Sequence, residues 1–254
     1  MRRNHLASLA GSLLLAGVLS GCGAVTTAQS QPERQLPTAP PAPTAAPAAP
    51  LAITAAPALP QLADLGALLV SDEFDSDLAD WRNKDIVSVP VSEPAVWQVR
   101  DGRVDQITGP EGYAALSPVT ILKGDAGLAD YTVQAMGNSQ GNEMMGVVAR
   151  ASDKGYYALV VRHAKADGTK VFIEKYDAAT ETFKTLARVE EGGWNVDEWT
   201  ALALTVKGDT LTGYVGGKQV IAATDATFAS GQPGLYGFGI GDLSFDHFAV
   251  NAAQ

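Results

Sequence analysis

Residues 144–163 read MMGVVARASDKGYYALVVRH, and this stretch decides the fold because it has the pattern of one β-hairpin. Apolar residues alternate with others on both sides of Asp153-Lys154-Gly155, and a glycine closing a short polar turn is typical of a hairpin loop. A three-residue turn would pair Ser152 with Tyr156 and, further along, Arg150 with Ala158.

Counting in twos from this turn assigns the side chains of the hairpin to two faces of a sheet. The face predicted to enter the core carries Val147, Ala149, Tyr157, Leu159 and Val161. The opposite face carries Val148, Arg150, Tyr156, Val160 and Arg162. Two arginines beside a tyrosine make this second face a candidate ligand surface, although a loop one residue longer or shorter would exchange the two faces.

Similar short apolar runs continue on both sides of the hairpin, and no stretch has a helical period of about 3.6 residues. Their connections, such as Asp101-Gly102, Lys207-Gly208-Asp209 and Gly216-Gly217-Lys218, place glycine where a tight turn needs a positive φ. Together they predict an all-β fold, a two-sheet antiparallel jelly-roll sandwich. The expected strands cover residues 95–100, 103–107, 113–117, 131–136, 144–152, 156–163, 170–176, 183–189, 199–206, 210–215, 219–223, 234–240 and 244–250.

Composition divides the chain of 254 residues before any motif is considered. Nine of the 14 prolines lie between Pro32 and Pro60, whereas residues 64–254 hold 15 basic and 27 acidic residues, a net charge of −12. The predicted organisation is therefore a tether over residues 22–63 followed by one domain over residues 64–254. Without a cluster of Lys and Arg, this acidic domain is a poor partner for nucleic acid.

The first 21 residues have the features of a bacterial lipoprotein signal peptide. Arg2 and Arg3 precede an uncharged apolar stretch, which ends in Leu19-Ser20-Gly21-Cys22, similar to a lipobox. We expect Cys22 to carry the lipid, so that a disordered Ala/Pro-rich tether holds the domain outside the cytoplasm at a cell membrane or outer membrane. An ordinary signal peptide with a chance cysteine is the alternative. As the only cysteine in the chain, Cys22 also excludes internal disulfides.

Several local motifs resemble those of the concanavalin A-like lectin/glucanase sandwiches, in particular the laminin G-like and 3-keto-disaccharide hydrolase domains of bacterial surface proteins. The resemblance covers roughly residues 70–252 and implies the same two-sheet architecture. The motifs are Phe74-Asp75-x-x-Leu78-x-x-Trp81, Trp97-x-Val99-x-Asp101-Gly102, the hairpin itself, Glu198-Trp199, Gly208-x-x-Leu211-x-Gly213-Tyr214-Val215-x-Gly217-x-x-Val220, Gly234-Leu235-Tyr236-Gly237 and Phe245-Asp246-x-Phe248-x-Val250.

Known catalytic patterns are missing from the sequence of the domain. The retaining glucanases of this superfamily use a strand of the form Glu-x-Asp-x-(x)-Glu, and the nearest string, Glu73-Phe74-Asp75-Ser76-Asp77, lacks the second glutamate. A Ser-His-Asp hydrolase is disfavoured because only His163 and His247 follow the signal peptide and no Gly-x-Ser-x-Gly elbow is present. We therefore assign no catalytic residue.

Acidic residues crowd the start of the domain, and the last strand carries one more. Asp72, Asp75 and Asp246 are candidate ligands for a structural Ca²⁺, since first and last strands are often neighbours in such sandwiches and hard carboxylates suit calcium. A solvated acidic turn without an ion is the alternative. No other cofactor is expected.

Sugars are recognised by aromatic rings that stack on the pyranose and by polar groups that bond its hydroxyls. The candidate ligand-binding residues are Arg150, Tyr156, Arg162, Glu174, Trp194 and Tyr236. Trp194 is included because it lies in a glycine-containing loop, where an indole would have no evident packing role; folding over a sheet edge is the other interpretation.

The leading hypothesis is a cell-surface lipoprotein whose β-sandwich binds a glycan or another ligand without catalysis. The first alternative, implied by the resemblance, is a hydrolase or lyase that acts on 3-keto-glycosides, with Arg150, Tyr156 and Glu174 as participants. The second is a protein-interaction or structural module. The sequence does not indicate an oligomeric state, a particular sugar or which membrane is used.

Overall fold

The computed structural model describes residues 53–62, 65–83, 95–107, 118–239 and 243–254, and Leu51–Gln254 forms one compact unit. All regular structure in these residues is β, and none of them forms a helix long and apolar enough to cross a membrane. The strands are β1 (Leu65–Asp72), β2 (Arg82–Asn83), β3 (Val96–Arg100), β4 (Arg103–Ile107), β5 (Val119–Leu122), β6 (Tyr131–Ser139), β7 (Met144–Ser152), β8 (Gly155–Val161), β9 (Val171–Asp177), β10 (Thr182–Val189), β11 (Thr200–Lys207), β12 (Thr210–Val215), β13 (Lys218–Thr224), β14 (Gln232–Phe238) and β15 (Leu243–Ala253).

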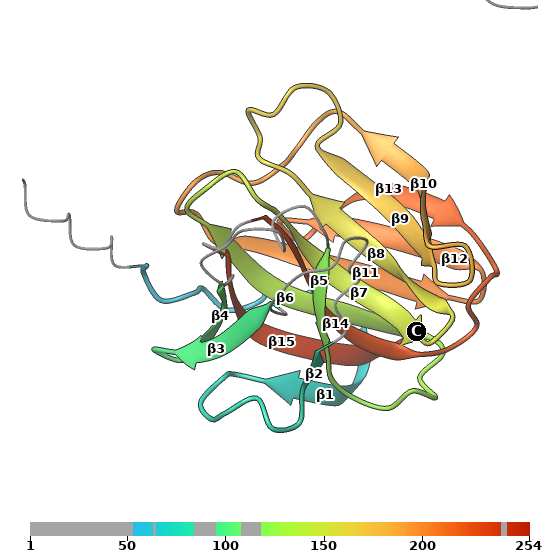
Figure 1. Ribbon diagram of the computed structural model, residues 1–254, viewed down its shortest axis with the longest axis horizontal. Coiled ribbons are helices and arrows are strands. Elements are labelled where there is room, and N and C mark those ends of the chain that lie inside the picture. Colours follow the sequence, from blue (N-terminus) through green and yellow to red (C-terminus); the bar gives the residue numbers. More distant parts are fainter. Residues whose placement is uncertain (1–52, 63–64, 84–94, 108–117, 240–242) are drawn as a thin grey trace, which may run out of the picture. The chain divides into compact units, whose positions relative to one another are not determined.

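The described strands form two antiparallel sheets that lie in two layers (Figure 1). An eight-stranded sheet has the order β13-β12-β11-β6-β15-β4-β3, with β1 paired to another part of the long strand β15. A seven-stranded sheet has the order β10-β9-β8-β7-β14-β5-β2. This arrangement confirms the predicted all-β sandwich.

The core lies between the sheets, where alternate residues of each strand point inward. From the seven-stranded sheet come the five hairpin residues predicted to face the core, Val147, Ala149, Tyr157, Leu159 and Val161, all completely buried. They pack with residues such as Val133 and Leu204 of the other sheet. The opposite face of the hairpin carries Val148, Tyr156 and Val160, so the predicted alternation is confirmed for these residues.

The predicted pairing within this hairpin is wrong. Ser152 pairs with Gly155 rather than with Tyr156, and Ala158 pairs with Val148 rather than with Arg150. The loop is one residue shorter than expected, which shifts the pairing by one residue, and a bulge at Arg150, where φ is 52°, shifts it by one more. Because a change of two residues in register leaves the alternation intact, the core-facing residues and Val148, Tyr156 and Val160 keep their predicted faces, whereas Arg150 does not.

Residues 53–62, which belong to the predicted tether, contact the outer face of the eight-stranded sheet. The Trp199 indole donates a hydrogen bond of 2.7 Å to the Thr54 carbonyl. Further along, Leu59 and Pro60 lie against Ala203 and Tyr214. We call this segment the strap; its contacts group it with the domain.

Several sequence predictions fall outside the described residues, among them the signal peptide, Cys22, most of the tether and the strand expected at residues 113–117. Two short segments that were not predicted as strands, Arg82–Asn83 and Val119–Leu122, extend the seven-stranded sheet beyond β14. A third, Leu65–Asp72, pairs with β15 and begins the eight-stranded sheet.

Candidate functional site

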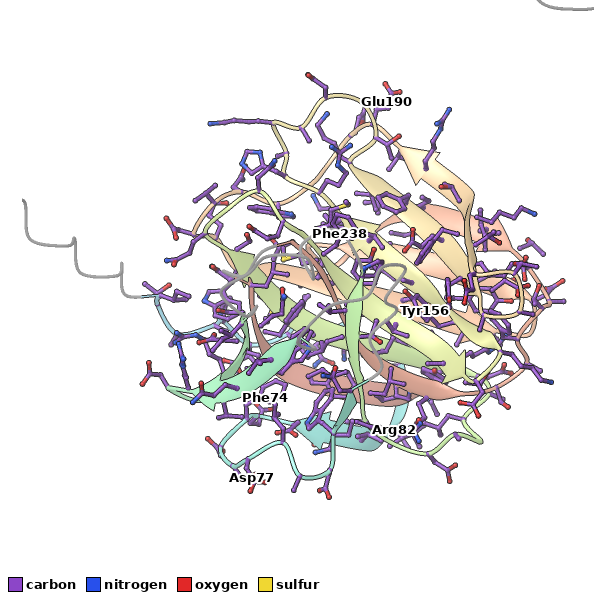
Figure 2. The ribbon with its side chains drawn as sticks, in the orientation of Figure 1. Phe74, Asp77, Arg82, Tyr156, Glu190 and Phe238 are labelled. Atoms are coloured by element: carbon purple, nitrogen blue, oxygen red, sulfur yellow. The ribbon has the colours of Figure 1, made fainter. Side chains whose placement is uncertain are left out.

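The outer face of the seven-stranded sheet carries a second group of buried side chains, separate from the core. It is rich in aromatic residues and contains a carboxyl group, an unusual neighbour for apolar side chains. We call this group the outer-face cluster; its main members are Met144, Val148, Tyr156, Phe172, Glu174, Tyr176, Tyr236 and Phe238. Figure 2 marks two of them, Tyr156 on β8 and Phe238 on β14.

Alternation along β9 brings Glu174 to this face. Val171 and Ile173 point into the core, so Phe172, Glu174 and Tyr176 point outward. Glu174 is buried, with only 7% of the residue exposed, because it lies between these two aromatic residues on the outer face.

The Glu174 carboxyl meets the Tyr236 hydroxyl in a hydrogen bond although β8 and β7 separate their two strands. Two small residues lie between them: Ala158 pairs with Glu174, and Gly146 pairs with Tyr236. Small residues at these positions leave room above the sheet for the two long side chains to extend toward each other.

Burial raises the pKa of Glu174 from 4.5 to about 7, although the hydrogen bond from Tyr236 acts in the opposite direction. Burial, together with the nearby Glu174 carboxylate, also raises the pKa values of Tyr156 and Tyr236 well above 10. Near neutral pH the site therefore has two neutral phenols and a carboxyl group that exchanges its proton easily.

Two polar atoms of the cluster are left without a hydrogen-bond partner within the described residues, the Tyr156 hydroxyl and Glu174 Oε1. Tyr156 is completely buried. Buried polar groups are nearly always hydrogen-bonded, so two such atoms on one face need an explanation. A ligand that donates hydrogen bonds would provide one.

Aromatic rings extend from the buried floor of the cluster to the sheet edge. The centroids of Tyr156 and Tyr176 are 5.6 Å apart, and those of Tyr176 and Phe183 are 4.8 Å apart. Phe183 lies on the edge strand β10 and is 42% exposed. The three rings form a continuous aromatic surface of increasing exposure, suitable for contact with a flat apolar partner.

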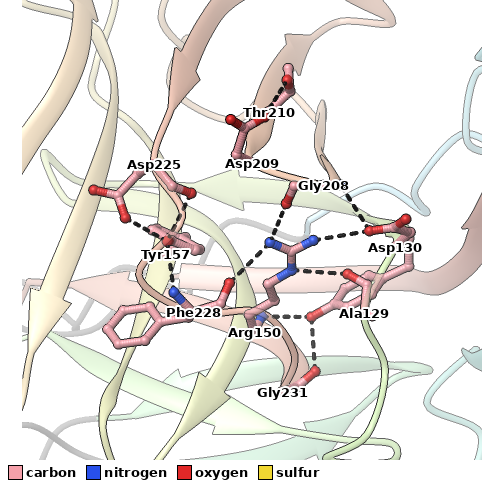
Figure 3. A network of polar contacts seen from close by, with 11 residues as sticks. Ala129, Asp130, Arg150, Tyr157, Gly208, Asp209, Thr210, Asp225, Phe228 and Gly231 are labelled. Carbon is pink, nitrogen blue, oxygen red and sulfur yellow. Dashed lines mark hydrogen bonds and ion pairs between the residues drawn. The ribbon is translucent and has the colours of Figure 1, made fainter.

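Arg150, in contrast, does not lie on this face, and its assignment to the ligand surface is corrected. The side chain is buried, and its guanidinium binds the carbonyls of Ala129 (2.9 Å), Gly208 (2.8 Å) and Phe228 (3.0 Å) and the Asp130 carboxylate (3.1 Å) (Figure 3). The left-handed backbone at the bulge turns Arg150 out of the alternation. The Arg150 guanidinium thus links three connecting segments at one end of the sandwich, those that contain Ala129 and Asp130, Gly208, and Phe228.

Trp194 is also buried, so the expectation of an exposed indole is corrected. It is 1% exposed, belongs to the core and contacts the His163 ring edge-on at 4.9 Å between centroids. Trp194 thus has a packing role in the core, and the interpretation as an exposed ligand contact is wrong. Arg162 donates to the Thr169 carbonyl (3.1 Å) and thus supports the loop before β9.

The three aspartates expected to hold calcium do not gather at one point. Asp72 accepts hydrogen bonds from Lys123 (2.6 Å), Trp81 (2.8 Å) and the Phe74 amide (2.8 Å). Burial alone would raise the pKa of Asp72, but these bonds lower it. The Asp72 carboxylate thus secures the first turn of the domain.

Asp246 instead lies with Glu73 and His247, whose possible ligand atoms are within 4.8 Å of one another. Burial, and after it the charges of Glu73 and Asp75, raises the pKa of Asp246 above its ordinary value, although His247 acts in the opposite direction. Calcium takes six to eight oxygen ligands, and two carboxylates beside an imidazole that already binds Glu73 are a poor fit. The calcium site remains a prediction, with Asp72 an unsuitable member.

The outer-face cluster thus contains three of the six predicted ligand-binding residues, Tyr156, Glu174 and Tyr236. Sequence reasoning did not include Phe172, Tyr176, Phe183 and Phe238. The signal that could have found two of them is the alternation within β9, where Phe172 and Tyr176 flank Glu174 at intervals of two.

No family model matches the chain, and no curated protein matches its sequence. Among solved structures, a protein of unknown function with a galectin-like fold from Bacillus subtilis aligns with a TM-score of 0.57 and 12% identity, over 74% of this chain and 97% of that one. The carbohydrate-binding module CBM66 from Bacillus subtilis aligns with a TM-score of 0.53 and 18% identity, over 68% and 96% of the two chains. A non-specific endo-β-1,3(4)-glucanase of family GH16 aligns with a TM-score of 0.50 and 13% identity, over 78% of this chain and 94% of that one. These similarities establish a galectin-like and concanavalin A-like sandwich.

Proposed function

We propose that this β-sandwich binds a carbohydrate at the outer-face cluster. The observation that carries the proposal is the pair of buried, unpartnered polar atoms on Tyr156 and Glu174, since sugar hydroxyls would supply the hydrogen bonds that the described residues do not. The rings of Tyr176 and Phe183 offer a stacking surface beside them. Support from fold similarity comes from the carbohydrate-binding module and the glucanase.

The test is a glycan-array screen of the full chain, followed by calorimetry on any glycan that binds. Tyr156→Phe and Glu174→Gln each remove a group that the ligand would use, and we expect each to weaken binding by about tenfold or more. Tyr214→Phe is the matched control, because Tyr214 lies on the other sheet beside the strap. Binding of unchanged strength in both site variants, or no binding to any glycan, would refute the proposal.

A second candidate is an enzyme that acts on glycosides, and the observation that favours it is the pKa of Glu174. A carboxyl group with a pKa of about 7 suits a general acid at neutral pH. The usual glycosidase mechanism needs two carboxyl groups, however, and Glu174 is the only one in the outer-face cluster as described. Turnover of a 3-keto-glycoside by the full chain, abolished by Glu174→Gln, would replace the binding proposal.

We also propose that the domain is displayed outside the cytoplasm as a lipoprotein. This part rests on sequence alone: the apolar segment after Arg3, the lipobox ending at Cys22 and the proline-rich tether. Labelling of cells with a palmitate analogue tests it. Incorporation into the wild type but not into Cys22→Ala supports the anchor, and incorporation that persists in the variant contradicts it.

A further inference from the structure

Glu174 has no countercharge among the described residues. Its partner is the Tyr236 hydroxyl, and no lysine, arginine or histidine in the described ranges forms an ion pair with it. The next residue in the sequence, Lys175, points to the other side of the sheet, where its ammonium binds Asp225 at 2.7 Å. The acidic group of the outer-face cluster is therefore uncompensated.

An uncompensated carboxylate in a buried position is unfavourable, and a neutral ligand would correct this only in part. A sugar hydroxyl can donate a hydrogen bond to Glu174 Oε1 but brings no positive charge. An ammonium group brings both, because it carries a full charge and three N–H donors and has no acceptor that needs a partner.

The surroundings of Glu174 offer acceptors for two of these donors and aromatic rings for the positive charge. Glu174 Oε1 and the Tyr156 hydroxyl oxygen are two acceptors without partners in the described residues. The rings of Tyr156, Tyr176 and Phe183 follow one another at 5.6 Å and 4.8 Å between centroids, and aromatic faces attract cations. A carboxylate beside several aromatic rings is a favourable setting for an organic cation.

We infer that the carbohydrate bound at the outer-face cluster is an amino sugar with a free amine, whose ammonium group pairs with Glu174 and lies against the tyrosine rings. This inference rests on the proposed function and specifies its ligand class. The net charge of −12 on residues 64–254 favours the approach of such a cation over that of sialic or uronic acids.

Three oligosaccharides with one backbone provide the test: β-1,4-linked tetramers of glucose, N-acetylglucosamine and glucosamine. They differ only at C2, which carries a hydroxyl, an acetamide or an ammonium group. Calorimetry with the full chain at pH 6 should show that the glucosamine tetramer binds at least about tenfold more tightly than the other two. In the wild type, binding should also release protons, because the ammonium group draws Glu174 into its ionised form; titrations in two buffers of different ionisation enthalpy measure this release.

Glu174→Gln should abolish both the preference for the amine and the proton release. The control Glu190→Gln removes an exposed glutamate from the loop after β10 and should change neither. If the amine preference survives in Glu174→Gln, general attraction to an acidic protein explains it, and the inference is overturned.

Two further outcomes separate this inference from the proposed function. Equal binding of all three tetramers, weakened by Glu174→Gln, would overturn the amino-sugar inference and leave carbohydrate binding intact. The inference also fails if none of the three binds while another glycan on the array does. If no glycan binds at all, the proposed function fails with it.

Discussion

Replacement of Glu174 by glutamine should change how the stability of the domain depends on pH. Glu174 has a pKa of about 7 in the folded protein against 4.5 when unperturbed. Between these values the folded state holds the proton more strongly than the unfolded state, so the free energy of unfolding falls as pH rises. A difference of this size corresponds to about 3 kcal/mol, present below pH 4.5 and lost by the time the pH has risen above 7.

Glutamine does not ionise in this range, so the free energy of unfolding of Glu174→Gln should not fall in this way as pH rises. We expect the variant to gain about 3 kcal/mol relative to the wild type between pH 4 and pH 8. For a domain of this size, that is a relative rise in Tm of roughly 6–12 °C. Other titrating groups contribute equally to both proteins and cancel in the comparison.

Urea unfolding followed by circular dichroism, at intervals from pH 4 to pH 8, measures the difference directly. Glu190→Gln, an exposed glutamate, serves as the control and should follow the wild type at every pH. If the curves of wild type and Glu174→Gln run parallel over the whole range, Glu174 is not a buried uncompensated acid. A cationic ligand would then have no buried carboxylate to pair with, and the amino-sugar inference would be refuted.

Three further substitutions, the first with a matched control, test other parts of the structure. Arg150→Met leaves the carbonyls it binds without donors and should cost about 3–5 kcal/mol in urea unfolding, whereas Arg162→Met should stay within about 0.5 kcal/mol. Gly155→Ala should destabilise by several kcal/mol, because φ is 139° there and a Cβ would lie 2.0 Å from a backbone oxygen; a normal melting temperature would contradict this. Trp199→Phe removes the hydrogen bond to the strap and should speed proteolysis within residues 53–62 while global unfolding stays unchanged; equal cleavage rates would show that this bond does not hold the strap.

The fold could be predicted from local patterns because strand alternation and turn chemistry are properties of neighbouring residues. Gly102 has a positive φ of 72° in its two-residue turn, and the predicted strand at residues 144–152 has the observed bounds. The register of the central hairpin could not be predicted in the same way. A bulge at an arginine in the left-handed region has no clear sequence signal, since most residues avoid that conformation.

For the candidate site, sequence reasoning found residues but not their arrangement. Glu174 and Tyr236 were both candidates, yet only the insertion of β14 beside β7 brings them within hydrogen-bonding distance. Arg150 and Trp194 were candidates of equal standing, and packing placed both in the interior. Residue type alone does not distinguish a ligand contact from a buried structural role, because both favour large side chains with polar groups.

The sequence by itself determined the all-β class, the two faces of the hairpin strands and the acidity of the domain, since these depend on composition and on intervals of two residues. Only the tertiary structure decided which outward-facing residues meet. Pairing between strands distant in sequence sets those contacts, and the burial that follows raises the pKa of Glu174 and leaves it without a countercharge among the described residues.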